Sequence, residues 1–400
     1  MADDLSAPAE PDSPYDLVLF GATGFTGRLV AHHLARHRPP GCRWALAGRN
    51  EERLSGVRAE LAAADPSLAG LPLLRADVTD AESMRALARS TRVVATTVGP
   101  YLQYGEPLVA ACAEAGTDYL DLTGEPEFVD RMYLAHHERA RETGARLVHC
   151  AGFDSIPYDL GVRFTVHQLP EGVPLHVTGM VTASGQLSGG TLHSALTAMS
   201  RARQMRETAA RRRDREPRPA GRRVHGAARP PHRDATLGRW LVPLPLVDAQ
   251  VVKRSAAALD RYGPDFTYGH YAGMRRLRSV VTGVAGMGAL AAAAQVPPLR
   301  RRLMQAIESG EGPDAERRAR SWFAVRFVGE GGGHRVVTEV SGGDPGYDET
   351  ATMFGQAALC LAFDDNPPAA GQVTTAVAMG ERLTDRLRAE GIRFDVLERG

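Results

Sequence analysis

The sequence predicts an α/β protein, in which an N-terminal doubly wound parallel sheet is followed by a mixed α+β second domain. Three observations support this fold class. Strand-like and helix-like segments alternate between residues 15 and 150, and a glycine-rich turn joins the first strand to the first helix. Beyond residue 150 the chain carries segments of alternating polarity, which are typical of an antiparallel sheet.

The alternating segments define the expected first domain, residues 15–160. Apolar runs predict strands at 15–20, 43–47, 71–75, 92–98, 118–122 and 146–150. Helical patterns predict helices near 26–37, 50–64, 80–89, 105–115 and 126–143. Strands that alternate with helices in this way form a parallel sheet with helices on both faces, so we expect a Rossmann-type domain.

The glycine-rich turn indicates where a dinucleotide would bind. The strand ends at Gly21, glycines recur at Gly24 and Gly27, and the helix starts at once. Gly21 allows a tight turn, Gly24 lets the backbone approach a pyrophosphate, and Gly27 lets helix and strand pack closely. The predicted cofactor loop also includes the residues between them, Thr23, Phe25 and Thr26. The spacing GxxGxxG differs from the commoner GxGxxG, so a glycine turn without a ligand stays the alternative.

The end of the second strand predicts NADP(H) rather than NAD(H). Sites that prefer NAD carry Asp or Glu here, which accepts hydrogen bonds from the ribose hydroxyls. This chain has Arg49 and Asn50 instead, with Arg53 one helical turn further on. A guanidinium cannot accept a hydrogen bond, but it can grip a phosphate in bidentate fashion. An arginine solvated at the end of a strand is the alternative.

Two further loops complete the expected cofactor site. Asp77 follows the third strand, where it lies beside the adenine or else caps the helix that begins near Asp80. The fourth strand ends in Val98, Gly99 and Pro100. Because strands one and four flank the switch point of such a sheet, we expect the nicotinamide ribose there.

Composition excludes several classes of protein. Lys253 is the only lysine, so a P-loop GK[ST] is absent, and Ala249 rules out a Tyr-x-x-x-Lys dyad. The four cysteines lack metal-ligand spacing, so we assign no metal and no disulfide. The net charge of +1 gives no reason to expect nucleic acid. Residues 1–14 lack the features of a signal peptide, so we expect a disordered tail on a cytoplasmic protein.

The second domain is expected to span residues 161–400. Polarity patterns predict strands at 175–184, 322–328 and 334–340, and helices near 191–206, 350–363 and 374–390. The Arg-rich stretch 201–233 predicts an exposed loop, as part of a flexible insertion at about 203–236. Residues 279–299 are uncharged and flanked by arginines, but their Ala, Gly and Pro content fits a membrane span poorly. We expect a buried or surface-lying helix there, with at most peripheral membrane contact.

Nine motifs together resemble one family. GATGFTG, AGRN, TTVGPYLQYG, GTDYLDLTGE and CAGFDSIPYDLG occur in order between residues 21 and 161. SGGT, YGPDFTYGHY, GEGPDAERRARSWFAV and GGDPGYDETATMFGQAALCLA follow. Over almost its whole length the chain resembles the saccharopine dehydrogenase-like family, in the branch of the trans-acting enoyl reductases. The resemblance implies a Rossmann NADP-binding domain, a substrate domain, and reduction of an enoyl chain carried by a partner polyketide synthase.

The implied reaction directs attention to the residues after strands four to six. Reduction of an enoyl thioester needs donors for the charge on the thioester oxygen and a proton for the α-carbon. Tyr101 and Tyr104 follow the fourth strand, Glu125 ends the fifth, and Asp154 and Ser155 follow the sixth. We assign Tyr101 as proton or oxyanion donor and Asp154 as organiser. Ser155 could bind the substrate or the nicotinamide amide. Packing tyrosines and helix-capping carboxylates are the alternatives.

Two other functions stay open. A saccharopine dehydrogenase-like enzyme for amino or imino acids would need converging arginines in the second domain, and the sequence marks no such group. A non-catalytic NADP sensor would keep the glycine turn and lack the chemistry.

Overall fold

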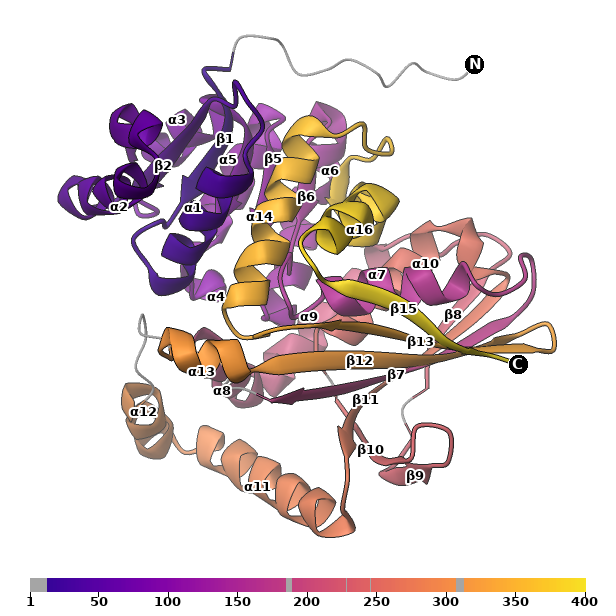
Figure 1. Ribbon diagram of the computed structural model, residues 1–400. Coiled ribbons are helices and arrows are strands. Elements are labelled where there is room, and N and C mark those ends of the chain that lie inside the picture. Colours follow the sequence, from indigo (N-terminus) through magenta and orange to yellow (C-terminus); the bar gives the residue numbers. More distant parts are fainter. Residues whose placement is uncertain (1–12, 185–188, 228, 245, 307–312) are drawn as a thin grey trace. The chain divides into compact units, whose positions relative to one another are not determined.

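The computed structural model describes residues 13–184, 189–227, 229–244, 246–306 and 313–400. Over these residues the chain divides into two compact units (Figure 1). Unit 1 contains residues 13–123, Phe128–Gly152 and Thr350–Arg386. Unit 2 contains Gly124–Glu127, Leu387–Gly400 and the described part of Phe153–Glu349.

Unit 1 is built on a seven-stranded parallel sheet in the order β14-β6-β5-β4-β1-β2-β3. Its strands are β1 (Tyr15–Phe20), β2 (Trp44–Gly48), β3 (Leu73–Arg75), β4 (Thr91–Thr96), β5 (Asp118–Asp121), β6 (Arg146–Val148) and β14 (Gly371–Val373). The predicted Rossmann-type sheet is confirmed. β1 pairs with both β2 and β4, so the strand order reverses beside β1, as the sequence predicts.

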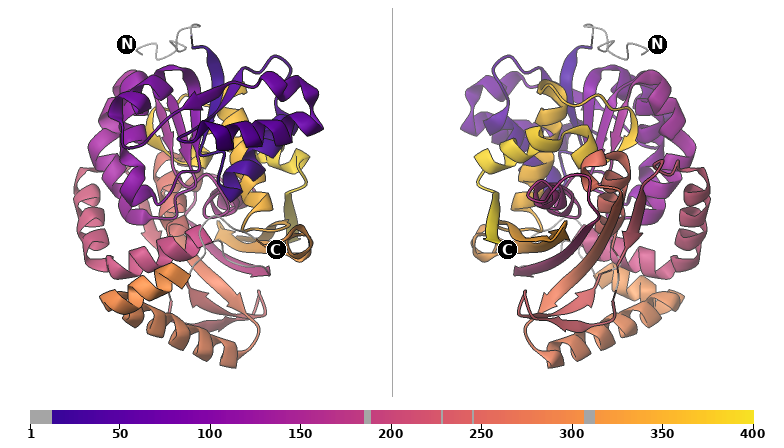
Figure 2. Two further views of the ribbon diagram at one scale, coloured as in Figure 1. Left: turned by 90° about the vertical axis from the view of Figure 1, so that its left-hand side faces the viewer. Right: turned by 90° about the vertical axis from the view of Figure 1, so that its right-hand side faces the viewer.

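Helices cover both faces of this sheet (Figures 1 and 2). They are α1 (Phe25–His37), α2 (Glu51–Ala64), η1 (Pro66–Gly70), α3 (Ala81–Arg89), α4 (Tyr101–Tyr104), α5 (Glu106–Ala115), α6 (Pro126–Thr143), α14 (Asp348–Phe363), α15 (Thr375–Ala378) and α16 (Gly380–Ala389). Because both faces are covered, the central strands are buried over most of their length, and the fully buried β2 reads as the apolar run Trp-Ala-Leu-Ala-Gly.

The predicted boundary near residue 160, with everything beyond it in one domain, is wrong for residues 350–386. This segment returns to unit 1, where β14 adds a seventh strand beside β6. Eleven of the sixteen residues of α14 are buried, and the Gln356 amide lies 3.0 Å from His33 Nε2 in α1. The Arg146 guanidinium donates to the Leu361 carbonyl oxygen. Such long-range pairing leaves no local mark in the sequence, and the three-residue strand β14 is too short to show a period.

Unit 2 is built on a mixed sheet with the path β15-β13-β12-β7-β11-β10-β9, and β8 pairs with β11 off this path. Its strands are β7 (Leu175–Ser184), β8 (Arg223–Gly226), β9 (His232–Asp234), β10 (Arg239–Pro243), β11 (Asp265–Met274), β12 (Trp322–Gly331), β13 (His334–Gly342) and β15 (Arg393–Arg399). β7 and β8 pair with β11 in parallel, and the other pairs are antiparallel. The predicted mixed second domain is therefore confirmed.

Unit 2 also contains helices, of which α7 packs on this sheet. They are α7 (Ile156–Val166), α8 (Gly189–Ser200), α9 (Ala202–Arg215), α10 (Asp248–Ala258), η2 (Asp260–Tyr262), α11 (Leu277–Gln295), α12 (Pro297–Ala306) and α13 (Ala315–Arg320). α7 lies against β7, β12 and β13. A Cβ atom at Gly161 would lie 2.5 Å from the Phe327 ring, so α7 packs closely on the sheet.

The Arg-rich stretch, which the sequence predicts as an exposed loop, contains helix α9 and strand β8 instead. Arginine is a good helix former, and Glu216 pairs with the buried Arg212 guanidinium at 2.7 Å. Arg201, which precedes the helix, makes two hydrogen bonds of 2.6 and 2.7 Å to the Glu127 carboxylate. β8 is fixed by its parallel pairing with β11. Low apolar content predicts the structure of this segment poorly, because ion pairs and backbone hydrogen bonds order it.

α11 is the one described helix that is long and apolar enough to cross a membrane. It contains most of the uncharged segment 279–299. Only Val280 and Ala294 are buried along it, so it lies on the surface of unit 2.

Substitution of Gly27 tests the packing of α1 on β1. Its Cβ atom would overlap the Gly21 carbonyl oxygen and lie 2.9 Å from Thr97 Oγ1. We expect Gly27→Ala to lower the free energy of unfolding by about 1–3 kcal/mol and to weaken NADPH binding. Gly56→Ala in α2 is the matched control, since no atom lies within 4 Å of the added carbon. That variant should gain about 0.5–1 kcal/mol. Denaturant unfolding measures both, and a Gly27→Ala protein as stable as the parent would contradict the packing argument.

Candidate functional site

The turn between β1 and α1 has the geometry of an anion-binding loop. Gly21 adopts a φ of +95°, which favours glycine, and its carbonyl oxygen accepts the Gly24 N–H at 3.1 Å. Gly24 is the N-cap of α1 and offers no side chain, and the first turn of the helix carries no acidic residue. A Cβ atom at Gly24 would meet only the Gly21 oxygen, at 3.6 Å, so the approach to the helix N-terminus is open. The loop therefore fits a pyrophosphate, with Thr23, Phe25 and Thr26 around it.

The end of β4 is fixed beside this turn. The Thr97 hydroxyl donates to the Gly21 carbonyl oxygen at 3.1 Å, and the Thr97 N–H donates to Phe20 O at 2.9 Å. The Val98 N–H donates to Thr96 Oγ1 at 3.2 Å. Gly99 and Pro100, joined by a cis peptide bond, lead from there into α4. The predicted residues Val98, Gly99 and Pro100 thus lie at the switch point.

Arg49 is exposed at the carboxyl end of β2, where its guanidinium can reach a phosphate. Asn50 has a local role, because its side-chain oxygen caps α2 by accepting the Arg53 N–H at 2.9 Å. Asp77 accepts hydrogen bonds from the Thr79 N–H and hydroxyl, both at 2.9 Å. These bonds hold the pKa of Asp77 below its usual value, and the charge of Arg49 adds to the effect. Asp80, rather than Asp77, caps α3.

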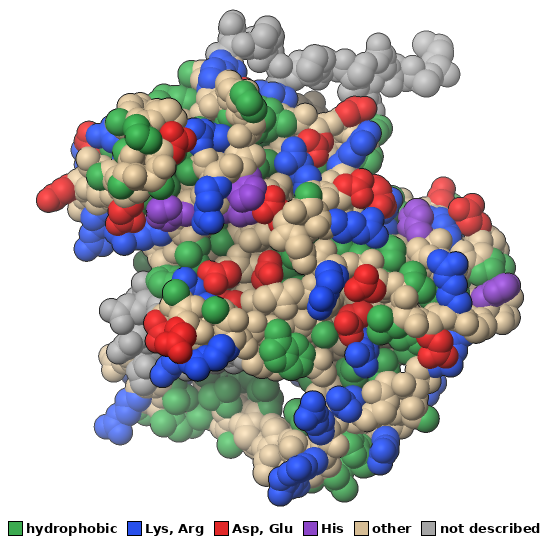
Figure 3. All heavy atoms as spheres, in the orientation of Figure 1, with side chains coloured by type: hydrophobic (Ala, Val, Ile, Leu, Met, Phe, Trp, Pro, Cys, Tyr) green, Lys and Arg blue, Asp and Glu red, His purple; other side chains and the backbone are tan. Residues whose placement is uncertain are grey.

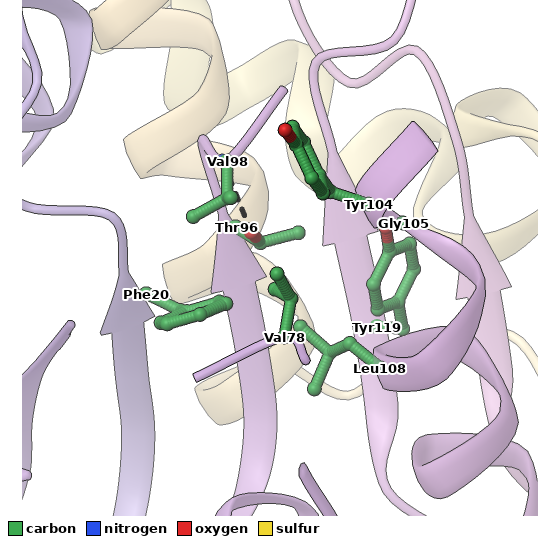
Figure 4. A pocket seen from close by; sticks show the side chains of 8 residues that line it. All are labelled: Phe20, Val78, Thr96, Val98, Tyr104, Gly105, Leu108 and Tyr119. Carbon is green, nitrogen blue, oxygen red and sulfur yellow. Dashed lines mark hydrogen bonds between the residues drawn. The ribbon is translucent and has the colours of Figure 1, made fainter. Parts of the chain in front are cut away.

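A small, shallow apolar hollow lies at the carboxyl ends of β1 and β4 (Figure 4). Phe20, Val78 and Val98 line it together with residues of α4, α5 and β5. Tyr104, one of the two predicted tyrosines, also lines it. The hollow adjoins the loops that carry Asp77 and Val98, so it offers an apolar surface next to the predicted adenine and ribose positions.

Tyr101 is buried, with 7% of its surface exposed, and packs against the Phe128 ring. Its hydroxyl donates to the Thr96 carbonyl oxygen at 3.2 Å and accepts the Leu122 N–H at 3.2 Å. These bonds join the ends of β4 and β5. The geometry favours a structural role for Tyr101, and its assignment as proton or oxyanion donor stays a prediction.

A carboxylate that the sequence did not mark organises the ends of β5 and β6. Asp121 is fully buried and accepts the Tyr119 hydroxyl at 3.0 Å. His149 Nδ1 lies 2.6 Å from the same carboxylate, and the Thr123 and Cys150 N–H groups donate to it at 3.0 Å. Asp121 thereby fixes the two chain segments that lead toward Gly124 and Phe153.

In unit 2, Asp154 and Ser155 directly precede α7. A Cβ atom at Gly124 would lie 3.0 Å from Asp154 Oδ2, so the absence of a side chain there makes room for the carboxylate. Burial, with the negative charge of Asp248 as a second cause, raises the pKa of Asp154 to about 7. The Ser155 hydroxyl is buried and has no hydrogen-bond partner among the described residues. The Asp154 carboxyl group, with a pKa near neutrality, is thus followed in the chain by a hydroxyl that has no described hydrogen-bond partner.

A second cluster, which the sequence does not mark, is formed around Asp248, whose negative charge contributes to the raised pKa of Asp154. His270 Nε2 lies 3.2 Å from Asp248 Oδ2, and His270 Nδ1 lies 3.0 Å from the Tyr268 hydroxyl. The Tyr158 ring contacts the His270 ring edge-on. Burial raises the pKa of Asp248, while His270 opposes that shift. The signal in the sequence is the pattern Tyr268-x-His270, because residues two apart share a face of a strand.

Glu125, a further candidate, is buried, and its carboxylate accepts the Ser194 hydroxyl at 3.3 Å. It lies in the short segment Gly124–Glu127 of unit 2, one residue beyond the glycine that makes room for Asp154. The structure thus brings Gly124 and Asp154 together, and Glu125 follows in the same loop.

Comparison with known proteins identifies the family of the chain. The saccharopine dehydrogenase NADP binding domain matches residues 17–148. A Mycobacterium tuberculosis relative is 37% identical over 94% of this chain and 96% of its own length. A second protein of that organism, named trans-acting enoyl reductase, is 36% identical over 96% of this chain and 98% of its own. A Mycobacterium leprae protein of the same name is 35% identical over 94% and 96%.

The fold has a counterpart among solved structures. Apo saccharopine dehydrogenase (L-Glu forming) of Saccharomyces cerevisiae covers 96% of this chain and 100% of its own, with a TM-score of 0.57 and 11% identity. The chain therefore carries an NADP-binding domain, is an NADP-dependent oxidoreductase, and belongs to the saccharopine dehydrogenase-like family, in the branch of the trans-acting enoyl reductases.

Proposed function

We propose that this protein reduces the double bond of an α,β-unsaturated acyl thioester with NADPH, in trans with a polyketide synthase. The observation that carries the proposal is the likeness to proteins named trans-acting enoyl reductase, which extends through unit 2 as well as the cofactor unit. The test is NADPH oxidation with a crotonyl thioester, free and on a carrier protein, and with an imino acid. We expect oxidation only with the thioester. Turnover of the imino acid alone would contradict the proposal.

The residues of unit 2 suit the proton-transfer half of this reaction. NADPH, when bound, supplies the hydride for the β-carbon. The α-carbon then needs a proton, and Asp154 can hold one at neutral pH because its pKa lies at about 7. The Ser155 hydroxyl is free of other described partners and can donate to the thioester oxygen as negative charge develops there. We infer that Asp154 is the acid and Ser155 the oxyanion donor.

Substitution of Arg49 tests whether the protein prefers NADPH to NADH. Its guanidinium is exposed at the end of β2, where it can bind the 2′-phosphate that distinguishes NADPH from NADH. We expect Arg49→Ala to weaken NADPH binding by roughly 10- to 100-fold, the effect of losing a charge-assisted bond, and to leave NADH binding unchanged. Fluorescence titration with both cofactors measures this. Arg36→Ala, an exposed arginine in α1, is the control. Equal NADPH affinity for the variant and the parent would remove Arg49 from the site.

Asp154→Asn tests the proposed acid. A carboxyl group with a raised pKa keeps its proton up to that pKa, so the rate should fall as pH rises through about 7. We expect the variant to lose about 100-fold or more in kcat and to lose this pH dependence. Glu349→Gln is the control, because burial also raises the pKa of Glu349. The measurement is the pH profile of kcat with a free enoyl thioester.

Tyr101→Phe, in the same assay, separates the two assignments of the proton donor. The ring stays in place, and the hydroxyl's bonds to Thr96 and Leu122 are lost. Turnover should therefore be retained, with a loss of about 1 kcal/mol in stability. Loss of turnover in this variant, with Asp154→Asn at the parental rate, would return the role to Tyr101.

A further inference from the structure

We propose that α11 and the start of α12 dock this protein onto an anionic lipid surface. Nearly the whole of α11 is exposed, although it carries apolar residues along its length. Leu277, Val281, Val284 and Met287 are 52%, 60%, 49% and 53% exposed, and these four residues are called the docking face. Isolated exposed apolar residues are common, but a continuous set on one element marks an interaction site.

The docking face is a single stripe of the helix. Its residues recur at spacings of four, three and three, which places them within an arc of about 120°. Few residues of α11 attach it to unit 2. Val280, which falls within the same arc near the start of the helix, and Ala294 are buried, the Gln295 amide donates to the Met199 carbonyl oxygen at 2.7 Å, and the Met274 methyl group lies close to Gly283. These contacts leave each of the four residues of the docking face about half exposed or more.

The charges around the stripe favour lipid over protein. Residues 275–305 contain six arginines and no Asp or Glu: Arg275, Arg276, Arg278, Arg300, Arg301 and Arg302. Figure 3 shows Lys and Arg side chains beside hydrophobic ones at the lower end of the molecule, where Figure 1 places α11. Cations at both ends of an apolar helix match phosphate headgroups above an acyl layer. An exposed apolar stripe flanked by cations, with no acidic residue nearby in the sequence, is the pattern of a helix that lies on an anionic lipid surface.

The topology favours a helix lying on the surface over one that spans the bilayer. β11 runs parallel to β7, and β12 pairs with β7 so that Trp322 lies opposite Ser184. The chain therefore leaves β11 and re-enters β12 at the same end of the sheet. A single span would leave its far end on the other side of the membrane, and no second apolar helix among the described residues returns from there.

Two of the three tryptophans lie at this same end of the sheet. Trp322, the first residue of β12, is 45% exposed. Trp240 in β10 is paired with Met274, the last residue of β11. Tryptophan prefers the boundary between headgroups and acyl chains. This placement is independent of the arginines and points to the same ligand.

Vesicle co-sedimentation of the full chain tests the proposal. The probes are phosphatidylcholine vesicles with and without phosphatidylglycerol, at low and high salt. We expect the protein to pellet with the anionic vesicles and to be released by salt or by carbonate. Val284→Glu/Met287→Glu should abolish pelleting, and Arg301→Gln/Arg302→Gln should weaken it on the order of tenfold. Leu246→Glu/Leu397→Glu is the matched control, since both leucines are 48% exposed elsewhere on unit 2.

Several outcomes would overturn the proposal. They are a protein that ignores anionic vesicles, a control that loses binding as fully as the docking-face variant, or pelleting that resists carbonate and so indicates a span. Sedimentation velocity without vesicles adds a fourth: a dimer that Val284→Glu/Met287→Glu converts to a monomer would assign the docking face to a second copy of the chain. Thermal unfolding of each variant shows that it is folded, so a loss of binding reports on the surface. The proposal does not depend on the enoyl substrate.

Discussion

One carbonyl oxygen, that of Gly21, occupies the space a side chain at position 27 would fill, and the cofactor half of the protein depends on this close approach. The same oxygen accepts the Gly24 N–H and the Thr97 hydroxyl. It therefore ties the first strand, the first helix and the end of β4 to one point. Backbone geometry, the Thr97 hydroxyl and the close approach of Gly27 at this one oxygen set the direction of the helix N-terminus, where a pyrophosphate would bind.

The two buried aspartates near the carboxyl edges of the strands illustrate how surroundings assign a role. Asp121 accepts hydrogen bonds from a tyrosine hydroxyl and two backbone N–H groups and lies against His149, so its oxygens are fully engaged in holding β5 and β6. Asp154 is also removed from water, but the charge nearest to it is that of another aspartate. The first is a structural anchor. The second has a pKa raised to about 7, so it can hold a proton near neutral pH, which is what a general acid requires.

The sequence predicts the parallel sheet well because each of its first five strands is followed by its own helix, and these alternating patterns are visible locally. It fails where order comes from distant partners. β14 is three residues long and is a strand only because β6 lies beside it. α9 is ordered by ion pairs that composition cannot reveal. In the site, glycine spacing located the turn, whereas the Asp248–His270 contact joins a helix to a strand and has no local signature.

The return of residues 350–386 to unit 1 makes this protein a poor candidate for folding while it is being synthesised. The cofactor half starts with β1, yet a helix with eleven of its sixteen residues buried and an edge strand follow two hundred or more residues after β6. Until then the surface that α14 covers stays open on the ribosome, and His33 lacks the amide of Gln356 beside it. A nascent chain with this order of elements exposes apolar surface until the last segment emerges, and such surface favours aggregation.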